Sequence, residues 1–369
     1  MERAAYAAGR RTERILSSPN FRDGVVRNIL PTPRMERPWA LDNLTRMGKT
    51  SLEFLDRGVE RVPRTPPPVV TPDVEEIARR APGLRITWLG HSTSLVAIDG
   101  ALFLTDPVFA KRVSPVPFAG PARFHAPPLS IGALPPLDAV VLSHDHFDHL
   151  DKAAVRLLAG TGVPLVVPLG VGGALAAWGI PDGQVTELDW WESVEVGGVE
   201  LHLTPARHFS GRGPGRMNTT LWGSWAFIGP RHKAWFSGDT GPFDAGVREI
   251  GDRFGGFDVA MIETGAWHPA WDEIHLGPLQ AVRMHELVRA RALVPIHWGT
   301  FNLALHAWDE PILHVQELMD NRSSALLAPV AGGTVAPDHP HVAPAWRDRW
   351  MEWRETDPDL SALRDPNDA

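Results

Sequence analysis

One run of nine residues constrains this chain more than any other feature. It reads Ser143-His-Asp-His-Phe-Asp-His-Leu-Asp151 and contains three histidines and three aspartates. The apolar segment Asp138–Leu142 before it predicts a short buried strand, and the pattern of Ala153–Ala159 after it predicts a helix. A buried strand, then a polar turn, then the first turn of a helix indicate a loop at the edge of a sheet that carries functional side chains.

Metal binding is the chemistry that this run favours. In an extended segment alternate side chains share a face, so His144 and His146 can point into one site. The turn toward the helix can carry Asp148 and His149 to a neighbouring point. The chain has no cysteine, so a tight transition-metal site must use histidine or carboxylate ligands. Neutral imidazoles and carboxylates suit borderline divalent ions such as zinc.

Further ligand candidates each stand where a predicted strand ends. A single histidine at such a place is usually structural, but several stations at strand ends are hard to attribute to chance. The candidates and the strands before them are His208 after Val199–Leu203, Asp239 after Ala234–Phe236, and His297 after Ala292–Ile296.

The remaining pattern predicts strands inside and helices outside. Asp99-Gly100 is a strong hairpin signal between two of the strands. We expect regular structure to begin at Leu84. The other expected strands are Arg85–Gly90, Thr93–Ile98, Ala101–Thr105, Pro164–Val167, Gln184–Leu188, Leu221–Ile228 and Phe257–Ile262. The other expected helices are Asp244–Arg253, Pro278–Ala290 with Pro278 in its first turn, and Pro311–Met319.

Composition narrows the class of protein. The chain has a net charge of −8, whereas a nucleic-acid binder is typically basic. The longest uncharged run, Leu157–Pro181, is broken by proline and glycine, so we expect no transmembrane segment. The first residues carry early charges and no apolar stretch, which predicts no secretory signal and a cytoplasmic location. We divide the chain into an extension with a proline-rich segment (1–83), a core domain (84–336) and a polar tail (337–369).

With these motifs in view, residues 84–333 resemble the metallo-β-lactamase superfamily. The branch that they resemble contains N-acyl-phosphatidylethanolamine-hydrolysing phospholipase D and its bacterial relatives. The resemblance implies an α/β fold, the αβ/βα sandwich, with a dinuclear metal site at one edge. The stretches that carry it, besides the 143–151 run, are Thr87–Thr93, Leu104–Pro107, Glu187-Leu-Asp-Trp-Trp-Glu192, Leu221-Trp-Gly-Ser-Trp225, Ser237-Gly-Asp-Thr-Gly241 and Ile296-His-Trp-Gly-Thr-Phe301.

The resemblance also implies a ligand scheme for two divalent ions, with zinc first and iron or manganese as alternatives. The first ion would take His144, His146 and His208. The second would take Asp148, His149 and His297, and Asp239 would bridge the two. A water shared by the ions would then be the nucleophile, which suits a chain without a Gly-x-Ser-x-Gly elbow.

Four residues around this set are expected to support it. Asp106 matches a family position near the ions and would orient a ligand, with a capping Asp before Pro107 as the alternative. His91 lies in a Gly-His-Ser-Thr turn and would support a ligand or order the loop, with an ordinary turn His as the alternative. Glu263 departs from the apolar segment of the mammalian-type enzyme and would contact a nearby His or Arg, or would change the choice of substrate. His275 precedes the helix at Pro278 and would hold an anion or protonate a leaving group, with a helix-capping surface His as the alternative. The expected catalytic residues are Asp148, Asp239 and His275.

The predicted function is a metal-dependent hydrolase, as a phosphodiesterase of phospholipase D type acting on N-acyl phosphatidylethanolamine-like lipids. A lactonase or other ester hydrolase of a phosphorylated metabolite, and a non-catalytic metal-binding interaction protein, are the alternatives. The partner is a small-molecule or lipid substrate and no nucleic acid; a peripheral contact with the inner membrane face and a homodimer stay open. A groove lined by Trp222, Trp225, Trp267 or Trp271 would favour lipid, and Arg207, Arg212 and Arg216 could form a phosphate-facing loop.

Overall fold

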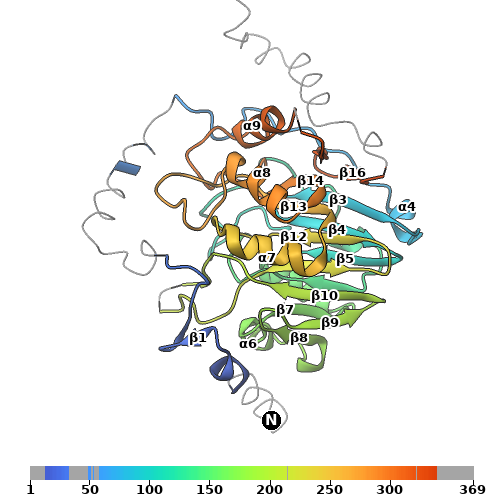
Figure 1. The fold of residues 1–369 in the computed structure, drawn as a ribbon, viewed down its shortest axis with the longest axis vertical. Helices are drawn as coiled ribbons and strands as arrows, with labels where there is room; N and C mark the ends of the chain where they lie inside the picture. Colours follow the sequence, from blue (N-terminus) through green and yellow to red (C-terminus); the bar gives the residue numbers. More distant parts are fainter. Residues whose placement is uncertain are drawn as a thin grey trace, which may run out of the picture.

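Two seven-stranded sheets face each other in the computed structural model of this chain (Figure 1). The structure describes residues 13–32, 49–50, 53, 58–213, 215–320 and 322–338. The sheets pack against each other through one buried face each, and helices cover their outer faces. This is the αβ/βα sandwich, so the expected fold class is confirmed by the architecture.

The first sheet combines antiparallel strands at one side with parallel strands at the other. Its spatial order is β16 (Thr334–Val335), β3 (Leu84–Gly90), β4 (Thr93–Ile98), β5 (Ala101–Thr105), β6 (Ala139–Val141), β7 (Leu165–Pro168) and β8 (Val185–Leu188).

The second sheet has the same mixed character. Its order is β15 (Ala325–Leu326), β14 (Ala290–Ile296), β13 (Phe257–Glu263), β12 (Lys233–Phe236), β11 (Ser224–Ile228), β10 (Val199–Thr204) and β9 (Ser193–Val196). A separate hairpin joins β1 (Phe21–Arg22) to β2 (Val25–Val26).

The helices fall into two groups, one on each outer face. On the first sheet lie α4 (Val74–Ala78), α5 (Lys152–Ala159) and α6 (Val171–Ala177), and on the second lie α7 (Asp244–Phe254), α8 (Pro278–Leu287) and α9 (Glu310–Met319). Two short 3-10 turns are η1 (Ile131–Ala133) and η2 (Asp182–Gln184). None of the helices in the described part of the chain is long and apolar enough to cross a membrane.

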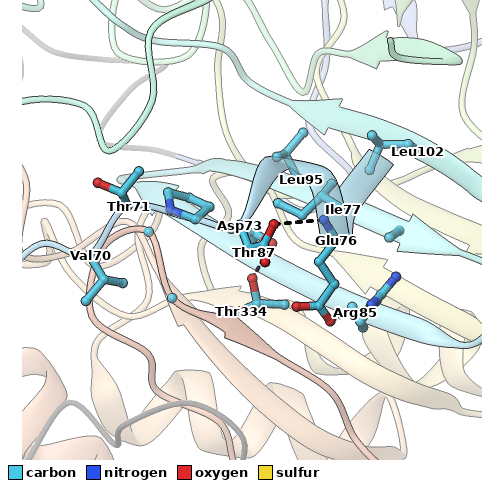
Figure 2. Close-up of a pocket in the computed structure, with 14 residues that line it drawn as sticks. Val70, Thr71, Asp73, Glu76, Ile77, Arg85, Thr87, Leu95, Leu102 and Thr334 are labelled. Carbon is cyan, nitrogen blue, oxygen red and sulfur yellow. Dashed lines mark hydrogen bonds and ion pairs between the residues drawn. The ribbon is translucent and has the colours of Figure 1, made fainter. Parts of the chain in front are cut away.

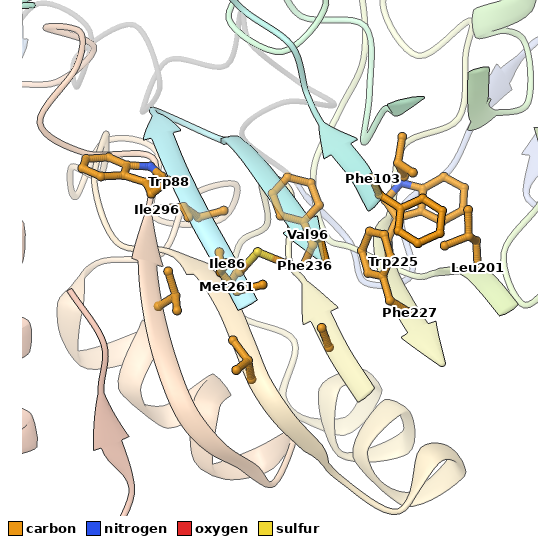
Figure 3. Packing of buried hydrophobic residues seen from close by; sticks show 14 of the residues in the cluster. Ile86, Trp88, Val96, Phe103, Leu201, Trp225, Phe227, Phe236, Met261 and Ile296 are labelled. Carbon is orange, nitrogen blue, oxygen red and sulfur yellow. The ribbon is translucent and has the colours of Figure 1, made fainter. Parts of the chain in front are cut away.

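The main core lies between the two sheets (Figure 3). Alternate residues of β4 show why both faces of that strand are apolar. Val96 points into the core between the sheets, whereas Leu95 points outward under the helices of the first sheet. Strands that are covered on both faces read as continuous hydrophobic runs, which is what the sequence shows at 93–98.

The expected elements are confirmed with shifted ends. The turn at Asp99 and Gly100 has φ of +50° and +96°, as a two-residue hairpin needs. Pro278 lies in the first turn of α8, which ends at Leu287 rather than at Ala290. The strand expected to start at Leu221 starts at Ser224.

Regular structure also occurs where none was expected. The short helix α4 precedes Leu84, so the expected starting point was wrong. The helix α6 was missed because its sequence, Val-Gly-Gly-Ala-Leu-Ala-Ala, contains two glycines that lower helix propensity. Burial of Val171 and Leu175 against the first sheet stabilises it instead.

The extension packs onto the first sheet. Val70 donates its backbone N–H to the carbonyl oxygen of Ala331 at 2.9 Å, so the proline-rich segment reaches the end of the core. A cavity of about 320 Å³ lies there, between this segment, α4 and the strands β3 and β16. Figure 2 shows the residues that line it. The proposed division at residues 83 and 336 stays a prediction, and residues 339–369 of the expected tail lie outside the described residues.

His285 in α8 is a buried titratable group far from any motif. Its side chain is 1% exposed, and neither ring nitrogen has a hydrogen-bond partner among the described residues. Burial lowers the pKa of His285 from 6.5 to about 4, while Glu286 and Arg322 act on it in opposite directions. The imidazole is therefore neutral in the folded protein near pH 7.

This burial predicts acid sensitivity with a definite sign. Because the folded pKa is depressed, the unfolded chain binds a proton below pH 6.5 that the folded chain takes up only near pH 4. We expect His285 to lower the free energy of unfolding by at most ~3 kcal/mol across that range. When the pH is lowered from 6.5 to 4, the free energy of unfolding measured with denaturant should fall less for His285→Leu than for the parent protein. The exposed His314→Leu is the control, and equal losses in all three proteins would contradict the prediction.

Candidate metal centre

The chain brings its ligand candidates together because their strands end at the same edge of the sandwich. In both sheets the relevant strands run in the same direction, so their carboxyl ends meet at this edge. The residues that follow these ends are His91 after β3, Asp106 after β5, Ser143–His149 after β6, His208 after β10, Asp239 after β12, Glu263 at the end of β13, and His297 after β14.

A first set of donor atoms is formed by three histidines and one carboxylate oxygen. His144 Nε2 and His208 Nε2 lie 2.8 and 3.2 Å from His146 Nδ1. The same two nitrogens lie 3.9 and 3.7 Å from Asp239 Oδ2. These four atoms lie within 4.8 Å of one another and could hold one metal ion.

A second set lies on the other side of the Asp239 carboxylate. Asp239 Oδ1 is 3.1 Å from His149 Nε2 and 3.2 Å from His297 Nε2. Asp148 Oδ2 is 3.5 and 3.4 Å from the same two nitrogens. One oxygen of Asp239 thus faces each set, which is the arrangement of a carboxylate between two ions.

Buried polar atoms without partners show that these sets fit metal ions. His149 Nε2, His297 Nε2 and Asp239 Oδ1 are buried and make no hydrogen bond among the described residues. A buried polar group that stays unpaired destabilises a fold by ~1–3 kcal/mol. Three such atoms pointing at one another are explained if a cation lies between them.

The protonation states agree with metal binding. Burial lowers the pKa of His144, His146 and His208, so these imidazoles are neutral, which is the form that binds metals. Burial would raise the pKa of Asp148 and Asp239, but the neighbouring histidines outweigh it and hold both values well below the usual range.

The other two histidines respond to the carboxylates. Burial lowers the pKa of His297, yet Asp239 and Asp148 outweigh it and raise the value to about 10. The pKa of His149 is raised in the same way by Asp239 and Asp148, against burial. The two carboxylates thus hold protons on these two imidazoles, and a divalent ion can take the place of these protons.

Asp106 anchors the metal loop through hydrogen bonds to two of its residues, Ser143 and His149. Its Oδ2 accepts a hydrogen bond from His149 Nδ1 at 2.7 Å and from the Ser143 hydroxyl at 2.6 Å. Its Oδ1 accepts from the Ser143 backbone N–H at 2.7 Å. Burial raises the pKa of Asp106, and these hydrogen bonds oppose that shift. Partners of this kind fix the orientation of metal-binding histidines.

His91 and His208 are held by comparable contacts. His91 Nε2 lies 3.1 Å from Asp148 Oδ2, and burial lowers the pKa of His91 to about 3. His208 Nδ1 donates to the carbonyl oxygen of Ile274 at 2.8 Å, which leaves Nε2 for the first set. His91 also lies close enough to the second set to serve as a donor there.

Glu263 connects three segments of the site and is fully buried. Its Oε1 accepts from the backbone N–H groups of Thr240 at 2.8 Å and Leu276 at 3.0 Å. Its Oε2 lies 3.0 Å from His275 Nδ1. Burial raises the pKa of Glu263, and His275 opposes the shift. His275 Nδ1 itself lies 3.9 Å from Asp239 Oδ2, so His275 stands beside both donor sets.

Backbone geometry at the site is unusual. Three non-glycine residues have positive φ: His91 at +55°, Asp106 at +34° and His297 at +64°. Each such conformation destabilises the fold by ~1–3 kcal/mol, and such residues cluster at functional sites. Close packing requires Gly238, because a Cβ there would lie 2.6 Å from the Ser143 Cβ.

The arginine and tryptophan expectations are corrected by the structure. Arg212 donates to the carbonyl oxygens of Asp145 and Leu150 at 2.7 and 2.8 Å, so it braces the metal loop. Arg207 donates to the carbonyl oxygens of Pro242 and Pro31, and neither arginine is a free phosphate-facing group; Arg216 is exposed.

Trp222 and Trp225 are buried core residues and line no groove, at 1% and 0% exposure. Their indole N–H groups donate to the carbonyl oxygens of Ala206 and Leu142, and so brace loops next to ligands. Trp267 and Trp271 are half-buried, beyond β13.

Asn28 is a residue of the site that sequence reasoning missed. Its side-chain oxygen accepts from the His208 backbone N–H at 3.0 Å, and its side-chain nitrogen donates to the His208 carbonyl oxygen. No signal marks Asn28, because it lies in the extension, 180 residues away from its partner. Arg212 was noticed, but its role as a brace depends on tertiary contacts.

The comparison with known families identifies the class. Residues 102–298 match the family model described as the beta-lactamase superfamily domain. The match spans more than half of the chain, so this chain belongs to the metallo-β-lactamase superfamily. The predicted family and fold are confirmed, and with them the class of enzyme, a metal-dependent hydrolase.

Individual relatives carry the comparison further. An uncharacterized protein of Mycobacterium tuberculosis is 42% identical over 335 residues, or 89% of this chain and 88% of that protein. N-acyl-phosphatidylethanolamine-hydrolyzing phospholipase D 1 of Caenorhabditis elegans is 43% identical over 252 residues, or 65% of this chain and 71% of that protein. The expected branch is therefore represented among its relatives.

Solved structures support the fold alone. A metallo hydrolase of Ignicoccus hospitalis superposes with a TM-score of 0.54 at 22% identity, covering 68% of this chain and 97% of that one. An isothiocyanate hydrolase from Delia radicum gut bacteria gives a TM-score of 0.54 at 21% identity, covering 68% and 98%.

Proposed function

We propose that this protein is a dinuclear metal-dependent phosphodiesterase that cleaves N-acyl phosphatidylethanolamine-like lipids in the manner of a phospholipase D. The observation that carries the proposal is the Asp239 carboxylate, which presents one oxygen to each of two donor sets. The similarity to the phospholipase D of Caenorhabditis elegans supports the substrate class.

Seven residues are proposed as ligands. The first ion is assigned to His144, His146 and His208, and the second to Asp148, His149 and His297, with Asp239 shared. Zinc is the metal that this histidine-rich, thiolate-free set favours. When bound, two such ions supply Lewis acidity and lower the pKa of a shared water.

The protein's own groups position the reaction around those ions. Asp106 holds His149 in the tautomer that presents Nε2, and His91 holds the Asp148 carboxylate. Asp148 and Asp239 would supply the negative charge that holds the two ions. His275 lies beside the Asp239 carboxylate that the two sets share, at 3.9 Å, without belonging to the proposed ligands.

His275 is proposed as the proton donor to the leaving alcohol. Its Nδ1 hydrogen points at Glu263 Oε2, so the ring presents Nε2 to a bound substrate. Its side chain is 15% exposed, whereas the neighbouring ligands His208, Asp239 and His297 are almost completely buried. Glu263 fixes this ring orientation, since its other oxygen is held by two backbone N–H groups.

Elemental analysis of the purified protein, coupled to a hydrolysis screen, tests this function. We expect two divalent ions per chain and release of phosphatidic acid from N-acyl phosphatidylethanolamine. In heavy-oxygen water a single turnover should place one labelled oxygen in the phosphoryl product. Labelled alcohol with an unlabelled phosphoryl product would contradict the mechanism. Turnover confined to lactones or phosphorylated metabolites would favour the alternative substrate class instead.

A further inference from the structure

A second cavity, of about 470 Å³, lies behind the metal loop. It is bounded by the segment after β5 and by the first turns of α5. Phe147, which stands between the proposed ligands His146 and Asp148, lines it on the inner side. None of the proposed metal ligands lines this cavity, so it is separate from the metal centre.

The lining is strongly cationic for a chain whose net charge is −8. Several arginines elsewhere on the surface are paired with carboxylates, as Arg80 is with Asp138 and Arg322 is with Glu286. Four cations of the cavity have no carboxylate within ion-pair distance in the described part of the chain. They are Arg112, Lys152, Arg156 and Arg212.

Asp151, the one carboxylate in the lining, is engaged by backbone groups. Its Oδ2 accepts from the N–H groups of Phe109 and Ala110, at 3.2 and 2.9 Å. Its Oδ1 accepts from the N–H groups of Ala153 and Ala154, at 2.9 and 3.3 Å. Asp151 supplies one negative charge against the four cations of the lining, so the lining keeps a net positive charge.

The four cations approach the cavity from three sides. Lys152 and Arg156 are one helical turn apart on α5, so they share a face. Arg112 comes from the opposite segment, where it donates to the carbonyl oxygen of Gly120. Arg212 forms the inner wall, with its guanidinium 4.0 Å from the ring centre of Phe147.

We propose that this cavity binds a phosphate group, carried by a small molecule or by a phospholipid headgroup, as a site distinct from the metal centre. The guanidinium groups of Arg112 and Arg156 can bind phosphate through paired hydrogen bonds, and the Lys152 ammonium adds charge. Arg212, which donates to carbonyl oxygens of the metal loop, adds positive charge to the inner wall. Phe147 and Arg212 also contact the metal loop, so an occupant lies one side chain away from the ligands. This site does not depend on the substrate proposed above.

Exposed apolar side chains beside the cavity are consistent with a phosphate group that belongs to a phospholipid headgroup. Phe118 is 80% exposed and follows Pro117, which lines the cavity. Leu157 is 62% exposed and follows Arg156. Apolar groups next to cations are the features that hold a protein at an anionic membrane surface.

Calorimetric titration of the metal-loaded protein with inorganic phosphate is the primary test. The double variant Lys152→Gln/Arg156→Gln should bind phosphate at this site about tenfold more weakly or worse, because it removes two cationic hydrogen-bond donors to the anion. Phosphate bound at the metal centre should be unaffected, since neither residue touches a ligand. The matched control is Arg79→Gln/Arg248→Gln, which removes two exposed charges elsewhere and should bind like the parent.

Co-sedimentation with vesicles of phosphatidylglycerol and phosphatidylcholine separates the two sources. If Lys152→Gln/Arg156→Gln and Phe118→Ala both lower vesicle binding by severalfold, the phosphate belongs to a lipid headgroup. If the double variant weakens inorganic phosphate alone and Phe118→Ala changes nothing, the site takes a free phosphorylated molecule. Equal binding of phosphate and of vesicles by the parent and the double variant would overturn the proposal.

Discussion

Asp239→Asn is expected to lose most of the bound metal and nearly all hydrolytic activity. The amide keeps the size of the side chain but removes the charge that both donor sets share. Removing a hydrogen-bond partner of a metal ligand typically lowers metal affinity by ~10–100-fold. Asp239→Asn should lower metal affinity by more than that, because Asp239 is itself a proposed ligand of both ions. Metal content and rate, measured on the same preparation, check the prediction.

Asp106→Asn provides the matched control for Asp239→Asn. Asp106 is equally buried and also contacts His149, but it lies on the outer side of that ring, away from the donor sets. We expect it to weaken metal affinity by ~10–100-fold and to leave two sites that fill at high metal concentration. Two ions in Asp239→Asn at ordinary concentration would show that this carboxylate does not bridge.

His275→Ala is expected to keep both ions and the fold while losing ~10²–10⁴ in rate. Removal of one general acid or one oxyanion donor has an effect of this size. The loss should appear in kcat more than in KM, because the group acts on the leaving alcohol. An unchanged rate would make His275 structural, and a lost ion would make it a ligand.

Glu263→Gln isolates the contact between Glu263 and His275. The two backbone N–H groups bind Oε1, and the Gln side chain can keep both through its amide oxygen. Its nitrogen then faces His275 Nδ1 and disfavours the ring orientation that Glu263 supports. We expect a lower kcat with full metal content.

The double variant His275→Ala/Glu263→Gln then tests whether the two residues act together. If Glu263 acts through His275, Glu263→Gln should add little to His275→Ala. Fully additive losses would show that Glu263 acts on the metal sites instead of on His275.

The sequence alone predicted the parts of this protein that depend on local pattern. The apolar runs at 93–98 and 139–141 predicted buried strands, because strands covered on both faces are apolar throughout. The His144–His149 run predicted a metal loop, since alternating residues and a turn place its side chains at one edge. Asp239 and His297 followed as strand-end residues, and the family resemblance supplied the scheme that combines them.

Contacts between distant segments were decided only by the tertiary structure. Trp222 and Trp225 read equally well as groove walls or as core, and only the packing of two sheets shows that they are buried. Arg212 read as a phosphate-facing cation, yet it binds carbonyl oxygens of a loop more than 60 residues away. Glu263, Asn28 and the basic cavity likewise depend on side chains that meet across the fold. Sequence patterns encode burial and local conformation, whereas these contacts arise from the three-dimensional order of the strands.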